Sequence, residues 1–164
     1  MPRRRRSWTL SRWTMTRYSN AVLSVLLWFF GGTLYFLLEV AYKTATESPE
    51  RISWTMLVLA VVLCVPVERA GYRLPWECPL WLQALCCAAL VTVTELAAGC
   101  VLNLWLGLDI WDYSDLPLNL LGQICLPFSL VWWALCLIFI PVFDWLRWAV
   151  IGGDRPQYTM GWRR

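Results

Sequence analysis

The chain has 164 residues, of which 59% are hydrophobic and 15% charged, with a net charge of +3 and a mean hydropathy of +0.53. Soluble proteins are typically about 45–50% apolar and about 25% charged. The thirteen tryptophans strengthen this contrast, because Trp collects at membrane–water interfaces. The composition therefore excludes an ordinary soluble globular domain and predicts an integral membrane protein.

A basic arm over residues 1–18 precedes the first predicted transmembrane helix, which covers about residues 20–42. Residues 21–38 carry no charge, and this length is close to the roughly 20 residues that cross a bilayer core. Glu39 and Lys43 then follow at i, i+4 spacing, which favours an ion pair on a helix surface. We expect this pair at the membrane interface, and a place for Glu39 in a polar intramembrane site is the alternative.

A short second span is predicted over residues 52–67 and a longer third span over residues 79–106. Glu95 is the one charge in the third span, with 17 uncharged residues before it and 13 after it. A carboxylate at membrane depth is costly and is typically paired, protonated or turned towards a cavity. Glu95 is therefore a candidate functional group, and the alternative is a hydrogen bond that holds two helices together.

An acidic and aromatic loop separates the third span from the fourth. In a membrane protein, irregular backbone beside a span is tolerated only where it faces protein or a water-filled cavity. We expect the aromatic residues of this loop to be interfacial anchors and its aspartates to form a solvated rim. The candidate residues of the loop are Trp111, Asp112, Tyr113 and Ser114.

The fourth span is predicted over residues 119–145, with a kink near its outer end. Pro127 lacks a backbone N–H, so in a helix it would free the carbonyl of Gln123. Asn119 lies one helical turn before Gln123. The two amides, the freed carbonyl and Glu95 are expected to line one polar pocket. The alternative is that the side-chain amides themselves hydrogen-bond to the freed carbonyl.

The distribution of positive charge predicts the orientation of the chain. Positive residues favour the cytoplasmic side of a membrane, and a basic arm beside a span more often contacts anionic lipid than nucleic acid. Lys43 and Arg51 would be the two outside, and both termini would then be cytoplasmic. The other twelve of the fourteen Lys and Arg would lie inside, namely Arg3, Arg4, Arg5, Arg6, Arg12, Arg17, Arg69, Arg73, Arg147, Arg155, Arg163 and Arg164.

The sequence offers little for catalysis. It contains no His, which removes a histidine base and the usual zinc sites. It also lacks the G-x-S-x-G elbow and the G-x-x-x-x-G-K-[ST] loop of serine hydrolases and nucleotide-binding proteins. We therefore expect no enzymatic activity, no catalytic residue, no metal site and no cofactor, and any ATP-driven work would need a second polypeptide.

The third span, the loop and the fourth span resemble a known family. Glu95, Gly99, the letters WDYS at residues 111–114 and LNLLGQICLPFSLVWW at residues 118–133 are similar to small multi-pass bacterial membrane proteins labelled "putative ABC-transporter permease, type IV". The resemblance is loose over residues 26–148 and close over residues 95–133. It implies a part in transport beside a separate ATPase.

Together these patterns predict an all-α integral membrane protein with four transmembrane helices in one domain, residues 19–149, and a cytoplasmic tail, residues 150–164. The leading functional hypothesis is a permease-like or transport-associated subunit in the cell membrane. The alternative is a membrane adaptor or sensor that does not transport and acts through helix–helix contacts. The expected partners are membrane lipids and either an ATPase subunit or further copies of the chain, with no nucleic acid.

Overall fold

The computed structural model describes residues 13–46, 52–74, 78–152 and 155–161. Most of the basic arm predicted over residues 1–18 lies outside these residues, as does the end of the tail beyond residue 161. The described part is mainly helical, which agrees with the predicted fold class.

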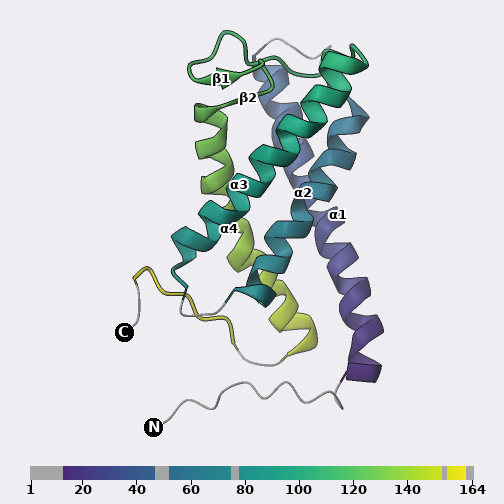
Figure 1. Ribbon diagram of the computed structural model, residues 1–164. Coiled ribbons are helices and arrows are strands. Elements are labelled where there is room, and N and C mark those ends of the chain that lie inside the picture. The colour runs from purple at the N-terminus through teal and green to yellow at the C-terminus, as the bar shows by residue number, and fades with distance from the viewer. Residues whose placement is uncertain (1–12, 47–51, 75–77, 153–154, 162–164) are drawn as a thin grey trace.

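Four α-helices form the body of the molecule (Figure 1). They are α1 (Trp13–Ala45), α2 (Trp54–Arg73), α3 (Leu80–Gly99) and α4 (Leu126–Ile151), and α3 continues as a π-helix, η3 (Cys100–Trp105). The helices alternate in direction, so that α1 and α3 run towards one end of the bundle while α2 and α4 run away from it. The ends of α1 and α3 and the starts of α2 and α4 therefore gather at one end, called the outer end below.

Within the described part of the chain, three helical segments are long and apolar enough to cross a membrane: Asn20–Ala45, Leu80–Trp105 and Leu126–Ile151. They correspond to the first, third and fourth predicted spans. α2 is not among them, and its last turns contain Glu68, Arg69 and Arg73. The helix also continues to Arg73, beyond the predicted end of the second span at residue 67.

The outer end differs from the prediction at the start of the fourth span. Residues 119–125 are not helical but contain two short antiparallel strands, β1 (Asn119–Leu120) and β2 (Ile124–Cys125). α4 begins only at Leu126, so Pro127 lies in its first turn, where a missing N–H costs nothing. The predicted kink at Pro127 is therefore wrong, because the helix starts where the kink was expected.

Small residues and apolar side chains pack the helices together. A Cβ atom on Gly32 of α1 would lie 2.7 Å from the backbone nitrogen of Val61, so α1 and α2 touch at this point. Such close approach is the usual role of glycine between membrane helices. The core between the helices is apolar, and its largest fully buried side chains are Val91 of α3 and Ile140 and Phe143 of α4.

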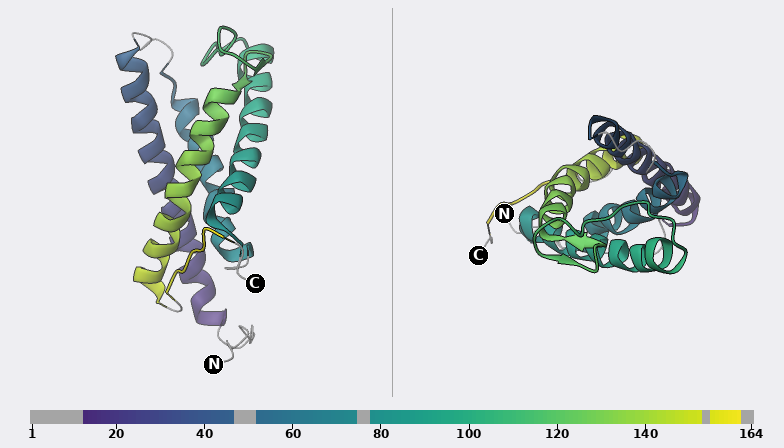
Figure 2. Two further views of the ribbon diagram at one scale, coloured as in Figure 1. Left: turned by 90° about the vertical axis from the view of Figure 1, so that its left-hand side faces the viewer. Right: turned by 90° about the horizontal axis from the view of Figure 1, so that it is seen from above.

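The outer loop, residues 106–118, and the hairpin of β1 and β2 lie across the ends of α3 and α4, as the view from above shows (Figure 2). Met56 at the start of α2 packs with Ile110 and Trp111 of the loop in a second, smaller apolar cluster. The start of α1 and tail residues 155–161 lie towards the opposite end of the bundle (Figure 1). The loop is therefore packed against three helices, which places its side chains beside the bundle interior.

Candidate functional site

The outer loop is fixed by a hydrogen-bond hub that the sequence did not indicate. The Nδ2 of Asn103, in η3, donates to the carbonyl of Trp111 at 2.9 Å and to Oε1 of Gln123 at 2.8 Å, while its Oδ1 accepts from the N–H of Ile110 at 2.8 Å. The indole of Trp111 donates to the carbonyl of Gln123 at 3.0 Å. These bonds join the π-helix, the loop and the hairpin into one unit.

Gly99 allows this unit to sit tightly on the end of α3. A Cβ atom at Gly99 would lie 2.5 Å from Oε1 of Gln123 and 2.8 Å from its Cβ. The regular helix ends at Gly99, and π-helical turns are frequent where a helix adapts to a functional or strained region. Gln123 is buried, as expected for a residue of a polar site. Its side chain, however, bonds to Asn103 and so holds the loop in place instead of lining a pocket.

Glu95 is buried, with 3% of its surface exposed, and it accepts two hydrogen bonds from neutral donors. The hydroxyl of Tyr113 donates to Oε1 at 3.2 Å, and the indole of Trp132 donates to Oε2 at 2.8 Å. Burial raises the pKa of the Tyr113 phenol well above its usual value and the charge of Glu95 raises it further, so Tyr113 stays protonated and donates. Glu95 thus holds an outer-loop side chain and an α4 side chain against α3.

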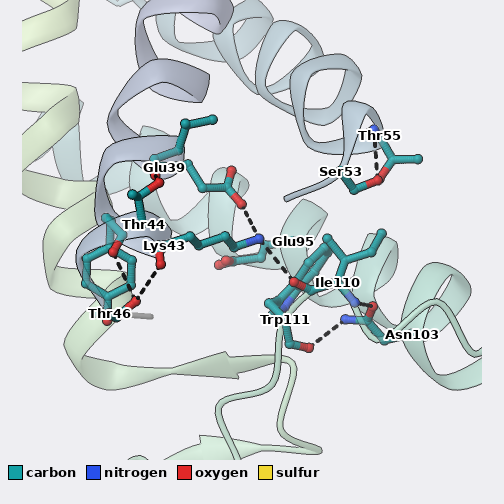
Figure 3. A network of polar contacts seen from close by, with 12 residues as sticks. Glu39, Lys43, Thr44, Thr46, Ser53, Thr55, Glu95, Asn103, Ile110 and Trp111 are labelled. Atoms are coloured by element: carbon teal, nitrogen blue, oxygen red, sulfur yellow. Dashed lines mark hydrogen bonds and ion pairs between the residues drawn. The ribbon is translucent and has the colours of Figure 1, made fainter. Parts of the chain in front are cut away.

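Glu39 and Lys43 form the ion pair that their spacing predicted, with 2.7 Å between Nζ and Oε1. The pair does not lie on an exposed helix surface, however, because both side chains are only 9% exposed. Lys43 also donates to the carbonyl of Ile110 at 3.1 Å and so links α1 to the outer loop (Figure 3). The second carboxylate oxygen of Glu39, Oε2, is buried and has no hydrogen-bond partner among the described residues.

A cavity of about 550 Å³ lies between α1, α4 and the outer loop. The Glu39–Lys43 pair lines it, and so do Tyr113 and Trp132, the two donors to Glu95. Most of the remaining lining is aromatic or aliphatic. The site therefore combines buried charge with a largely apolar space at the outer end of the membrane-spanning helices.

Most of the predicted site residues lie at the cavity, but Asn119 does not. Glu39, Asp112, Trp111 and Tyr113 line the cavity, and Glu95 lies directly behind Tyr113. Asn119 is exposed and does not join them, because its Nδ2 donates to the carbonyls of Ser114 and Leu116 within the loop. Asn119 was expected on the fourth helix beside Glu95, and the hairpin turns it away.

The other candidate residues of the loop bond within the protein. Trp111 is 5% exposed and hydrogen-bonded inside the molecule, so it is not the interfacial anchor that we expected. Ser114 donates through Oγ to Oδ1 of Asp112 at 2.6 Å, and its N–H donates to the same oxygen. Gly122 allows this turn, since its φ is +68° and an added Cβ would lie 2.7 Å from that oxygen. Among the described residues, no three His, Cys, Asp or Glu side chains form a group that could hold a metal ion.

A second buried charge pair lies towards the other end of the bundle. Glu68 of α2 pairs with Arg147 of α4, and it also accepts from Oγ of Ser24 at 3.2 Å and from the indole of Trp28 at 3.3 Å. Arg147 donates in addition to Ser24 at 2.8 Å. The sequence did not indicate this pair, although both residues follow long apolar runs.

The fold and composition define a helical membrane protein, and comparison with known proteins adds its family. The model of the family described as "Putative ABC-transporter type IV" matches residues 26–152. The chain therefore belongs to this family, which confirms the resemblance drawn from the loop and the fourth span. No match was found among curated proteins or among solved structures. The family and the three apolar helices together fit a membrane protein associated with transport.

Proposed function

We propose that this chain is a permease-like membrane subunit of a transporter and that the outer cavity receives the transported molecule. The cavity carries the proposal: it has a volume of about 550 Å³, lies between two membrane-spanning helices, and is bordered by a buried ion pair. Ionisable groups at membrane depth typically mark substrate or ion pathways. Membership in an ABC-transporter family supports the same function.

We further propose that α2 also crosses the membrane, giving four spans with both termini in the cytoplasm. Its 20 residues correspond to about 30 Å of helix, the thickness of a bilayer core. Glu68, the buried charge near its end, is neutralised by Arg147 and so does not oppose insertion. The excess of Lys and Arg at the end that carries both termini supports the orientation.

Thiol labelling tests this orientation. In a background without native cysteines, Asp115→Cys in the exposed outer loop should react with an impermeant thiol reagent in intact cells, and Arg155→Cys should react only after lysis. Labelling of Arg155→Cys alone in intact cells would reverse the orientation.

We also propose that the chain has no catalytic centre and that a separate ATPase supplies energy. The sequence contains no His to serve as a general base, and the buried carboxylates bond to Lys43, Arg147, Tyr113 and Trp132. The tagged chain, purified from its native membrane in mild detergent, should bring with it a protein that carries a phosphate-binding loop and hydrolyses ATP. Recovery of an envelope enzyme or a regulator in its place would favour the adaptor function.

Filling the cavity tests its role within that complex. Leu135 lines the cavity from α4, so Leu135→Trp should leave the complex assembled but remove the transport-dependent part of its ATP hydrolysis. Ile138→Trp is the matched control, because Ile138 lies on the same helix and is 59% exposed. Equal activity of the two variants would contradict a role for the cavity.

A further inference from the structure

Three aromatic rings lie in a row on the wall of the cavity. The ring of Phe128 on α4 stacks on Tyr113 with 4.6 Å between centroids and meets Tyr42 of α1 edge to face at 6.1 Å. All three residues line the cavity. Aromatic faces attract ammonium groups, most strongly where water is excluded.

Below these rings the cavity opens sideways and continues inward. Leu38 and Val131 line it from α1 and α4, and each is about half exposed on the outside of the bundle, in segments able to cross a membrane. Tyr35, Trp132 and Leu135 are shared with a smaller apolar pocket of about 40 Å³ between the helices. An occupant with an apolar tail can therefore enter from the lipid side and extend into the bundle.

The charges that line the cavity favour a cation. Among the described residues, three carboxylates line it, Glu39, Asp112 and Asp115, against one cation, Lys43. Residues 107–120 contain no Lys or Arg, so the outer loop adds no positive charge to the cavity. An anionic head group would meet carboxylates here.

Glu39 supplies the second, independent sign of a ligand. Its Oε1 pairs with Lys43, but its Oε2 is buried without a partner among the described residues. Buried polar atoms are almost always hydrogen-bonded, and an exception calls for an explanation. Glu39 lines the cavity, so rotation of its carboxylate would bring Oε2 to an N–H group bound there.

We propose that the cavity binds an amphiphilic ammonium ion, with its head at Glu39 beneath the aromatic rings and its apolar tail in the inner pocket. This proposal rests on the proposed function, since it names the chemical class of the molecule that the cavity receives. The ammonium group belongs either to a free alkylamine-like cation or to the head group of a membrane lipid.

Calorimetric titration with octylammonium tests the proposal on the full chain in dodecyl maltoside, with protein-free micelles as the reference. Saturable binding is expected, while octanol and octyl sulfate, which share the tail, should not compete. Glu39→Gln should weaken octylammonium binding about tenfold or more, which corresponds to about 1.4 kcal/mol. Tyr42→Leu, at a half-exposed residue, should weaken it about two- to fivefold.

Asp109→Asn is the matched control. It removes an acidic charge from the outer loop, at a residue that does not line the cavity. Its affinity should equal that of the unchanged protein. Competition by dioleoylphosphatidylethanolamine, but not by dioleoylphosphatidylglycerol, would identify a lipid head group as the ligand, and the absence of competition would identify a free cation.

Non-saturable binding, equal binding of octanol, or an affinity unchanged in both Glu39→Gln and Tyr42→Leu would overturn the ligand class. The titration needs no ATPase. If octylammonium fails to bind while Leu135→Trp still disables the transporter complex, the proposed function stands and only the ligand is wrong.

Discussion

The two buried ion pairs of this protein differ in how completely their carboxylates are satisfied. Both oxygens of Glu68 accept hydrogen bonds, from Arg147, Ser24 and Trp28, and the pair is enclosed by three helices. Glu39 bonds only to Lys43, keeps one oxygen without a partner among the described residues, and borders a cavity. The first arrangement is complete without a ligand, whereas the second is not.

This difference separates a structural charge from a functional one. A buried pair needs good geometry and further hydrogen bonds to offset the loss of hydration. The Glu68 pair has them and ties α1, α2 and α4 together. The Glu39 pair lacks a hydrogen bond to Oε2 among the described residues. It borders the cavity, where a ligand can supply that bond.

Breaking the Glu68 pair should have the largest effect on stability. Glu68→Ala removes the carboxylate that pairs with Arg147 inside the bundle and should lower the free energy of unfolding by about 3–5 kcal/mol. Steric trapping in bicelles measures this loss. The double variant Glu68→Met/Arg147→Met should recover much of it, because both charges of the pair are removed together.

The outer pair provides the contrast in the same assay. Glu39→Gln should cost only about 1–2 kcal/mol, since the cavity lets water reach Lys43 and one carboxylate oxygen already lacks a partner. Equal losses in Glu68→Ala and Glu39→Gln would remove the distinction between the two pairs.

Gly99→Ala should have the next largest effect, and it acts on the outer end alone. The added methyl group would lie 2.5 Å from Oε1 of Gln123, so it would displace the amide that holds Asn103. Forced overpacking of this kind costs about 1–3 kcal/mol. Gly161→Ala is the control, since nothing lies within 4 Å of its added Cβ, and it should unfold like the unchanged protein. A lower free energy of unfolding in Gly99→Ala without faster hydrogen exchange in the outer loop would contradict this mechanism.

Glu95→Gln tests whether Glu95 positions the cavity wall. A glutamine has one acceptor oxygen for two donors, so one of the bonds from Tyr113 and Trp132 is weakened, at a cost of about 1 kcal/mol. Tyr113→Phe removes one donor and should cost a similar amount. The double variant should cost less than the sum, because both changes affect the same contact. Strict additivity in the unfolding assay would show that the two residues do not act together.

Much of the helical fold could be predicted from the sequence because apolar runs in a membrane protein have one main interpretation. Residues 21–38 and the long run around Glu95 are helical as expected, and Glu95 is buried well inside its helix. A lone carboxylate in such a run stands out, because placing it in lipid would be costly.

The start of the fourth helix could not be predicted in the same way. Residues 119–125 are apolar enough to continue the span, and Pro127 is compatible both with a kink and with the first turn of a helix. Tertiary contacts decide between these structures, since Asn103 and Gly99 hold Gln123 in the hairpin. The Glu68–Arg147 pair was missed for a related reason, because its partners are 79 residues apart and meet only through packing.

The smallest expected effect separates the loop from the cavity. Asn119 donates to the carbonyls of Ser114 and Leu116 and accepts from the N–H of Gly122 at 3.3 Å, but it does not line the cavity. Asn119→Ala should therefore cost about 0.5–1.5 kcal/mol, because its bonds are exposed and water replaces them in part. Octylammonium affinity should be unchanged, since the walls at Glu39, Tyr42 and Phe128 do not depend on this turn. A loss of binding in Asn119→Ala comparable to that in Glu39→Gln would mean that the loop conformation itself controls the cavity, and that the hairpin belongs to the site rather than supporting it from outside.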